Sequence, residues 1–376
     1  MIVSTDSHVI EPPDLWISRM PRSLRERAPH LVADDDADWW YVDGLKLMSV
    51  HGGVDVGVRF EDQAKLRMAA RMSEVRRGGY EPDSKLADMD ADGVDREVLY
   101  TTLGLQLWRL PDTALLQSLF AAYNDWIAAF CAAAPHRLAG VALVLLDDID
   151  AGIAELQRAA RLGLRGAMIS VYPDESIAYD HPRYEPVWAA AADLDVVLSL
   201  HIGTNRVLPS PPSSTSHAPS DMALKFLSTP ARYTTAAHWV QLSLANMIFA
   251  GVFERHPTLK VVSLEHEIAW VPHFLQSMDY TYTQRARRSQ WYRFQDEARP
   301  SDFFHRNVMI SFQEDALGLR LRDVVGVGNL VWGSDYPHAE STFPHSRVIL
   351  DRLFAEIPDA ERTQILDTNA TALYFS

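Results

Sequence analysis

The sequence predicts an α/β fold of the (β/α)8 barrel class, also called the TIM barrel, and three observations favour it. Eight short runs rich in β-branched residues recur along the chain, and amphipathic helical patterns separate them. The first and the last run are each followed by acidic residues and histidines. The length of 376 residues suits one large α/β domain, which we expect to span residues 1–376.

The candidate strands are residues 2–6, 97–101, 138–143, 166–170, 196–201, 260–264, 307–311 and 330–333. Helical patterns fall between them at 111–134, 149–162, 184–194, 236–255, 269–278 and 320–325. Strands that alternate with helices form parallel sheets, and eight such units close into a barrel. Strand one then lies beside strand eight, although the two are at opposite ends of the chain.

Three segments depart from this alternation, and we expect them to be cap insertions after strands one, five and six. Residues 9–82 are expected to cover the barrel mouth, with a hairpin around Asp43-Gly44, a dipeptide that favours tight hairpin turns. Residues 202–230 are rich in proline and serine, and residues 280–294 are aromatic and basic. Loops after the carboxyl ends of barrel strands commonly carry the binding site.

Composition excludes several classes of partner. A formal net charge of -15 argues against nucleic acid and against anionic membrane surfaces. No apolar stretch is long enough for a membrane span. The single cysteine, Cys131, permits no disulfide within the chain, and the first residues carry no signal-peptide pattern, so we expect a cytoplasmic protein. A small molecule is the expected partner.

Four residues at predicted strand ends have the chemistry of metal ligands. Asp6 and His8 are two residues apart, so an extended strand points both side chains to the same face. His201 closes the fifth strand, and Asp335 follows the eighth. Two imidazoles and two carboxylates suit one divalent ion, for which we favour Zn2+, with Mn2+ or Fe2+ as alternatives. The competing interpretations are a turn cap at Asp6 and a hydrogen-bonded core histidine at His201.

Four motifs resemble the amidohydrolase superfamily, in particular the amidohydrolase-related branch that includes aminocarboxymuconate-semialdehyde decarboxylase and the resorcylate-type decarboxylases. The motifs are residues 6–12 (DSHVIEP), 89–95 (MDADGVD), 251–260 (GVFERHPTLK) and 333–338 (GSDYPH). The resemblance covers essentially the whole chain. It implies that His201 and Asp335 are metal ligands and that Asp335 also carries a proton. The family commonly has histidine or glutamate where Asp6 stands, so Glu11 is an alternative ligand.

The resemblance also implies a catalytic histidine after strand six, and His266 matches that place when Trp270 and Pro272 are used to align it. The residues around it depart from the family pattern, so Glu265 is the alternative pocket residue. His338 and Glu340, on the loop after strand eight, are further candidates for orienting Asp335 or contacting substrate. The alternative for both is an ordinary polar loop.

These features together predict a mononuclear divalent-metal enzyme that decarboxylates an aromatic or unsaturated carboxylic acid without oxidation. Asp335 would deliver a proton to carbon as CO2 leaves, while His266 would polarise the substrate. The alternative is a hydrolase of an amide, ester or lactone that uses the same residues. A barrel that binds a small molecule without turnover is a third hypothesis. Family habit adds the expectation of a homodimer.

Overall fold

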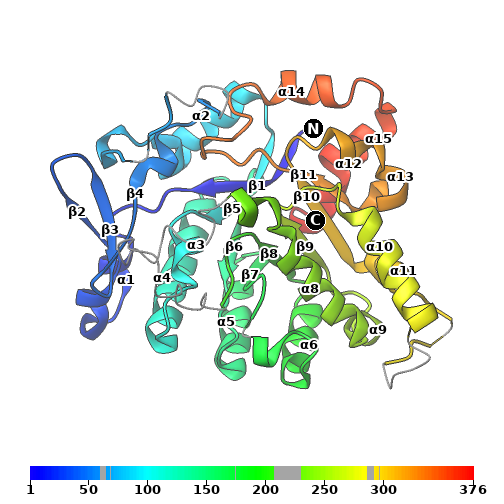
Figure 1. Ribbon diagram of the computed structural model, residues 1–376. Helices are drawn as coiled ribbons and strands as arrows, with labels where there is room; N and C mark the ends of the chain where they lie inside the picture. The colour runs from blue at the N-terminus through cyan, green and yellow to red at the C-terminus, as the bar shows by residue number, and fades with distance from the viewer. Residues whose placement is uncertain (60–64, 68, 174, 207–229, 286–291, 296) are drawn as a thin grey trace.

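An eight-stranded parallel sheet, curled into a nearly closed barrel, is the centre of the fold in the computed structural model (Figure 1). The structure describes residues 1–59, 65–67, 69–173, 175–206, 230–285, 292–295 and 297–376. The barrel strands, in spatial order, are β1 Val3–Val9, β5 Arg96–Thr101, β6 Leu138–Leu143, β7 Gly166–Ile169, β8 Val197–His201, β9 Val261–Leu264, β10 Val308–Phe312 and β11 Leu330–Trp332. All eight predicted strands are confirmed, and so is the barrel.

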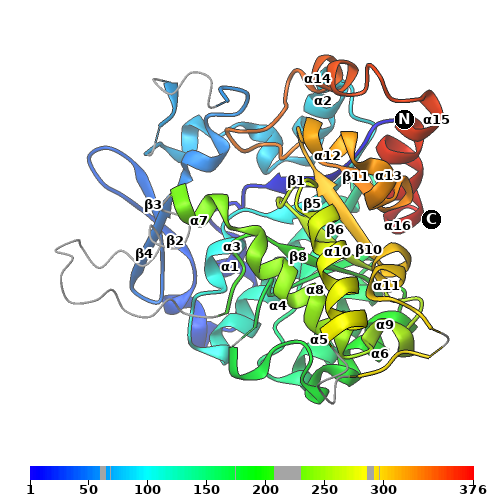
Figure 2. The same ribbon diagram turned by 45° about the vertical axis from the view of Figure 1, so that its right-hand side comes forward.

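Helices cover the outside of the barrel (Figures 1 and 2). They are α1 Leu15–Arg19, α2 Pro82–Asp92, α3 Gly104–Leu107, α4 Thr113–Cys131, α5 Ile149–Arg161, α6 Glu185–Asp193, α7 Pro230–Thr234, α8 Ala237–Phe249, α9 Val252–Arg255, α10 Val271–Tyr280, α11 Pro300–Asn307, α12 Ala316–Arg320, α13 Arg322–Val325, α14 Ser346–Leu353, α15 Asp359–Thr363 and α16 Asn369–Tyr374. The helix predicted at 236–255 is two helices, α8 and α9. Gly251 separates them with a φ of 73°, a conformation that glycine adopts without strain.

The segment after β1 forms a small antiparallel sheet beside the barrel (Figure 1). Its strands are β2 His30–Ala33, β3 Asp38–Val42 and β4 Leu45–Ser49. The predicted hairpin joins β3 to β4, and both of its turn residues have positive φ, 50° at Asp43 and 76° at Gly44. The same segment also reaches the loop after β11, where the Arg59 N–H donates to the Ala339 carbonyl at 2.9 Å.

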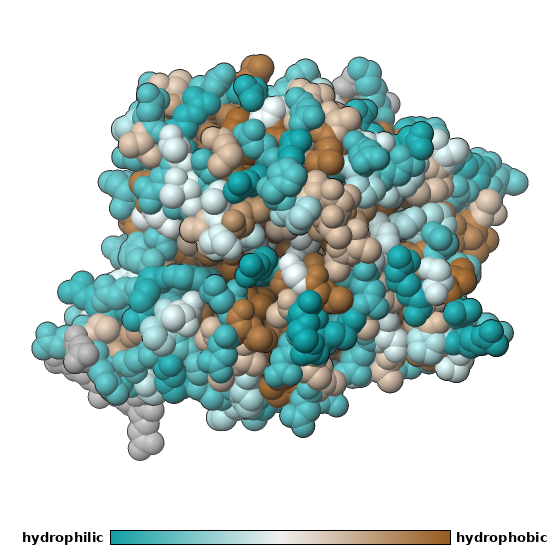
Figure 3. All heavy atoms as spheres, turned by 180° about the vertical axis from the view of Figure 1, so that it is seen from behind, coloured by the Kyte–Doolittle hydropathy of each residue, from teal (hydrophilic) through white to brown (hydrophobic). Residues whose placement is uncertain are grey.

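The other two predicted caps are only partly described. Residues 207–229 of the second and 286–291 of the third lie outside the described residues. The third begins with a π-helical turn, Thr281–Arg285, that extends α10. Within the described residues, no helix combines the length and apolar character that crossing a membrane requires. Figure 3 shows hydrophilic side chains over much of the face seen from behind, with hydrophobic ones in small groups between them.

The core lies between the barrel strands and the helices around them. Every residue of β6, β7, β8 and β9 is buried. These strands read as nearly continuous apolar runs because a parallel sheet is covered on both faces. Polar residues are therefore conspicuous wherever they interrupt a strand or follow it.

Such polar residues gather where the barrel closes. Among the described residues, β1 and β11 share no strand pairing, whereas every other neighbouring pair of barrel strands does. Hydroxyl groups bridge the gap instead: Thr5 Oγ1 donates to the Trp332 carbonyl at 3.0 Å, and Ser4 Oγ accepts from the Ser334 N–H at 2.9 Å. Two backbone bonds continue it, from the Asp335 N–H to the Asp6 carbonyl at 2.8 Å and from the His8 N–H to the Tyr336 carbonyl at 2.5 Å. We call this contact the β1–β11 seam.

Gly333 is essential to the seam because a Cβ atom there would collide with Cβ of Asp6. We predict that Gly333→Ala lowers the free energy of unfolding by about 1–3 kcal/mol, the usual cost of overpacking. Gly328→Ala is the matched control, since its Cβ would meet only Gln364 Nε2, at 3.4 Å. The control should stay within about 0.5 kcal/mol of wild type in urea denaturation. Equal stability of the two variants would contradict the proposed close approach.

Candidate metal centre and pocket

Strand β1 carries Asp6 and His8 to the barrel mouth. The register of β1 against β5 shifts between Ser4 and Ser7, a β-bulge of the kind that re-aims side chains next to functional sites. Both side chains are buried. The predicted strand ended at Asp6, but β1 continues to Val9, so both residues lie within it.

Three further side chains come from the ends of other strands. His201 is the last residue of β8 and is fully buried. Glu265 follows β9 with a φ of 58°, and Asp335 follows the β11 strand with a φ of 60°. Positive φ is unfavourable for residues with a Cβ atom, and such strain commonly collects at functional sites. The Glu265 carboxylate lies near His8 and His201, and the Asp335 carboxylate lies near His8.

Both histidines offer Nε2 to the centre of this cluster. His8 Nδ1 lies 2.8 Å from the Thr101 carbonyl, and His201 Nδ1 lies 2.9 Å from the Ile202 carbonyl. A carbonyl oxygen only accepts hydrogen bonds, so each Nδ1 carries the proton. Each Nε2 is left as the metal-binding nitrogen, the arrangement common for histidine ligands.

The spacing of the ligand atoms fits a divalent ion. His8 Nε2 lies 3.4 Å from Glu265 Oε1, 3.5 Å from Asp6 Oδ1 and 3.4 Å from His201 Nε2. His201 Nε2 lies 3.5 Å from Glu265 Oε1. Donor atoms about 2.0–2.2 Å from a tetrahedral ion lie roughly 3.3–3.6 Å from one another.

A buried oxygen without a partner supports the same interpretation. Asp6 Oδ1 is inaccessible to solvent and has no hydrogen-bond partner among the described residues. A buried carboxylate oxygen needs a compensating partner, which a cation would supply. Asp6, His8, His201 and Glu265 therefore form a candidate divalent metal site.

Charges in the cluster shift one another's protonation. Burial alone would lower the pKa of His8, but Asp6 and Glu265 raise it to about 9. Burial opposes ionisation of Glu265, yet His201 and His8 hold its pKa below the usual range. Burial raises the pKa of Asp335 well above its usual value, and the nearby charge of Glu265 adds to this effect. Opposite charges thus share one buried space.

Asp335 borders the cluster together with His338. Asp335 Oδ1 lies 3.5 Å from His8 Nε2 and 2.7 Å from His338 Nδ1. The other imidazole nitrogen of His338 lies 3.0 Å from Thr102 Oγ1, so this histidine is held at both ends. His8, Glu265, Asp335 and His338 make a second, overlapping group with metal-ligand spacing.

The structure does not bring the other three sequence candidates, His266, Glu11 and Glu340, into the cluster. His266 Nδ1 lies 3.0 Å from Ser263 Oγ, and burial lowers the pKa of this imidazole to about 3. Its Nε2 is buried with no partner among the described residues. Glu11 accepts from the N–H groups of Leu103 and Gly104 at 3.0 and 3.2 Å, so it caps the start of α3.

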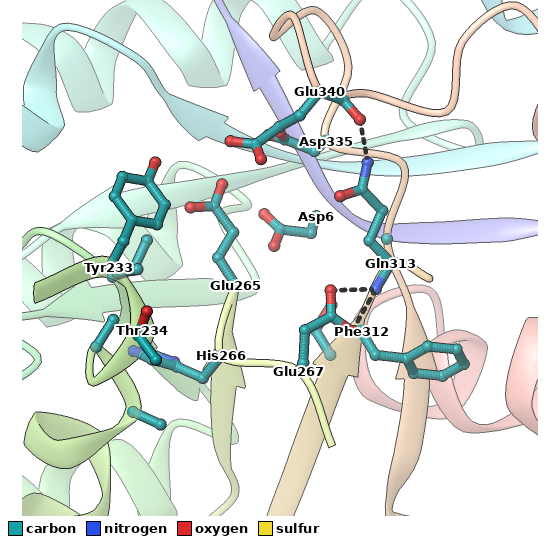
Figure 4. A pocket seen from close by; sticks show the side chains of 15 residues that line it. Asp6, Tyr233, Thr234, Glu265, His266, Glu267, Phe312, Gln313, Asp335 and Glu340 are labelled. Carbon is teal, nitrogen blue, oxygen red and sulfur yellow. Dashed lines mark hydrogen bonds between the residues drawn. The ribbon is translucent and has the colours of Figure 1, made fainter. Parts of the chain in front are cut away.

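A cavity of about 320 Å3 opens beside the cluster. Its lining residues come from β1, α7, the start of α8, the ends of β8–β10 and the segments that follow β8–β11, and they are Asp6, Ile202, Tyr233, Thr234, Ala236, Ala237, Glu265, His266, Glu267, Ser311, Phe312, Gln313, Gly333, Asp335 and Glu340. Figure 4 shows the carboxylates of Asp6 and Glu265 facing one another, with His266 turned toward Thr234. The cavity thus adjoins the cluster and holds both candidates that follow β9.

Some lining residues were not among the candidates predicted from the sequence. The Gln313 side chain donates to the Glu340 carbonyl at 2.7 Å, and its backbone N–H lies 3.3 Å from Glu267 Oε1 (Figure 4). Tyr233 comes from α7, next to the predicted second cap. In the sequence, only the position of Gln313, shortly after the seventh predicted strand, indicated that it could line the cavity.

Comparison with known proteins identifies relatives of the chain. Residues 29–375 match the sequence family described as Amidohydrolase. The gamma-resorcylate decarboxylase of Rhizobium sp. (strain MTP-10005) is 27% identical over 310 residues, covering 78% of this chain and 86% of that protein. These matches confirm the resemblance expected from the four motifs.

Solved structures show the same fold. An amidohydrolase from Mycobacterium avium subsp. paratuberculosis K-10 superimposes with a TM-score of 0.77 at 18% identity, over 99% of this chain and 97% of that one. A dihydroxybenzoic acid decarboxylase from Polaromonas sp. JS666, with bound manganese and the inhibitor 2-nitroresorcinol, gives 0.62 at 17% identity, over 99% and 96%. Both likenesses extend over nearly the whole barrel.

We predict that Mn2+ stabilises protein from which metal has been removed. An ion bound only by the folded state adds about 2.7 kcal/mol at a hundredfold excess over its Kd. Thermal melting with increasing Mn2+ or Zn2+ measures this, with a double variant, Asp6→Ala and His201→Ala, as the control that should not respond. A melting temperature that neither ion raises in the wild-type protein would contradict a metal site in this cluster.

Proposed function

Because the chain belongs to the amidohydrolase family, we propose that it is a metal-dependent, non-oxidative decarboxylase of an aromatic carboxylic acid. The observation that carries this proposal is the cluster of Asp6, His8, His201 and Glu265 beside a small cavity, with Asp335 at its border. The similarity to a gamma-resorcylate decarboxylase over most of both chains supports the reaction class.

Asp6, His8, His201 and Glu265 would hold the ion. Two of these four ligands are carboxylates, and carboxylate ligands suit harder ions. This favours Mn2+ over the Zn2+ expected from the sequence. The manganese in the Polaromonas decarboxylase supports the same choice. When bound, such an ion acts as a Lewis acid and as a template for substrate oxygens.

The cavity suits a compact substrate. Its volume of about 320 Å3 is near the lower end of the range for ligand pockets, roughly 300–1,000 Å3. Ile202, Ala236 and Ala237 contribute apolar lining, and Asp6, Glu265 and Asp335 line the cavity where it meets the cluster. Glu267 and Glu340 add two further carboxylates to the lining. A single substituted ring, with its carboxylate and a neighbouring oxygen directed to the cluster, fits this division.

Asp335 is placed to move the proton. It lines the cavity, is only 4% exposed, and is hydrogen-bonded to His338, which fixes its orientation. We propose that Asp335 gives a proton to the ring carbon that bears the carboxylate. The bond to the carboxyl carbon then breaks, its electron pair returns to the ring, and CO2 leaves. His266 also lines the cavity, but its Nε2 is buried and its Nδ1 faces Ser263 Oγ, so the imidazole would have to turn before it could contact a substrate oxygen.

The reaction products distinguish decarboxylation from hydrolysis, which would use the same residues. Release of CO2 from a panel of hydroxybenzoic acids supports the lyase. Formation of a new acid together with an amine or alcohol, from an amide, ester or lactone, would show that the protein is a hydrolase and would contradict the decarboxylase proposal.

Glu265 and Glu11 provide a matched test of the ligand set. We predict that Glu265→Gln lowers metal affinity by at least about tenfold, because an amide is a weaker ligand than a carboxylate. Glu11→Gln should keep the wild-type affinity, since that carboxylate caps α3. Elemental analysis and titration calorimetry measure both. Equal affinity in the two variants would remove Glu265 from the ligand set.

Asp335→Asn tests the proton donor. We predict a loss of about 10²–10⁴-fold in kcat, the usual contribution of a general acid, with the fold retained by circular dichroism. Metal content of the variant is measured in parallel, so that lost metal is not taken for lost proton transfer. A metal-loaded variant with kcat within about tenfold of wild type would contradict the role of Asp335.

A further inference from the structure

Lys85, on α2, is a fully buried cation that the proposed chemistry does not use. Its Nζ lies 2.6 Å from Glu97 Oε2, and it donates to the His8 carbonyl at 3.4 Å. The same nitrogen lies 3.8 Å from the centre of the Tyr336 ring. Lys85 thus makes an ion pair, a hydrogen bond and a cation–π contact at once.

Two of the three contacts lie on opposite sides of the β1–β11 seam. His8 is a candidate ligand on β1, and Tyr336 directly follows Asp335 after β11. The His8 N–H donates to the Tyr336 carbonyl, so Lys85 contacts both partners of one seam hydrogen bond. This hydrogen bond is one of the contacts that join β1 to β11 in place of strand pairing. The Lys85 ammonium therefore adds a further contact between the two strands at the point where the barrel lacks pairing.

Helix α2 also holds the far end of Tyr336. The Tyr336 hydroxyl donates to Asp88 Oδ2 at 2.5 Å, and Asp88 receives two hydrogen bonds from Arg76, at 2.6 and 2.7 Å. Asp88 is three residues after Lys85, hence on the same helix face. A side chain at Gly78 would collide with Asp88 and with the Tyr336 hydroxyl. The ring face and the hydroxyl are thus both fixed from one helix.

Stability alone does not explain a buried Lys85–Glu97 pair. Removing two charges from water costs much of what their attraction returns, and apolar residues of similar size often serve a core equally well. A charge partner for Glu97 also requires no contact with the His8 carbonyl or the Tyr336 ring. The extra contacts point to a role at the seam.

We propose that Lys85 is a positioning residue for the metal centre, acting through His8 and Tyr336 to fix where His8 Nε2 and the Asp335 carboxylate lie. The inference rests on the proposed function, because it assumes that the cluster binds a divalent ion. Helix α2 would then control the geometry of the cluster and of the cavity, although it contributes no residue to either.

The double variant Lys85→Met with Glu97→Met tests this role. It removes both charges together, so neither is left buried and unpaired, and unbranched side chains fill similar space. We expect cooperative thermal unfolding as in the wild type, with Mn2+ affinity about 10–100-fold weaker by titration calorimetry, the usual effect of losing a support of a ligand. The electron paramagnetic resonance spectrum of bound Mn2+ should also change. Arg322→Met with Glu361→Met, a pair 2.5 Å apart outside the pocket, is the control that should keep wild-type affinity.

Lys85→Arg is the second variant, in case the double variant does not fold. It keeps a cation for Glu97, but a planar guanidinium cannot place donors as the ammonium does. We expect it to fold and to bind Mn2+ at least tenfold more weakly than wild type. Wild-type affinity and spectrum in a folded Lys85 variant would overturn the positioning role and leave the proposed function intact. A wild-type protein that binds no divalent ion would overturn both.

Discussion

The β1–β11 seam is the constraint on which the rest of the site depends. A barrel of eight strands must join its first strand to its last, and here hydroxyl groups and two backbone hydrogen bonds do so. Asp6, His8 and Asp335 all belong to this contact, so closing the barrel brings the β1 half of the cluster together with Asp335, opposite His201 and Glu265 from β8 and the end of β9. Gly333 permits the close approach, because any side chain there would collide with Asp6.

The cluster is costly for the fold to maintain without a cation. Carboxylates and imidazoles share a buried space, and two of the acidic residues adopt positive φ values at roughly 1–3 kcal/mol each. Strand ends fix the positions, and hydrogen bonds donated by Nδ1 of each histidine to a backbone carbonyl fix the imidazole tautomers. A divalent ion would offset the repulsion between the carboxylates, which gives the strained arrangement a physical reason.

Much of the fold could be predicted because buried parallel strands can be recognised in the sequence as short apolar runs. The same logic marked Asp6, His8, His201 and Asp335, each a polar residue at the end of such a run. Spacing could not choose between Glu265 and His266, because the answer depends on a backbone turn of positive φ after β9. Spacing also could not place Glu11, whose carboxylate accepts a hydrogen bond from the backbone at the start of α3 and so does not extend to the cluster. Lys85 had no signal, since a lysine in an acidic helix is usually exposed.

The central claim is that one divalent ion is bound at the seam. Anomalous X-ray scattering from crystals grown with Mn2+ tests it most directly, because it locates the ion without reference to activity. We expect one strong peak within about 2.0–2.3 Å of donor atoms from Asp6, His8, His201 and Glu265. A structure with Mn2+ present but no peak in this cluster, or with the ion bound only elsewhere, would contradict the claim.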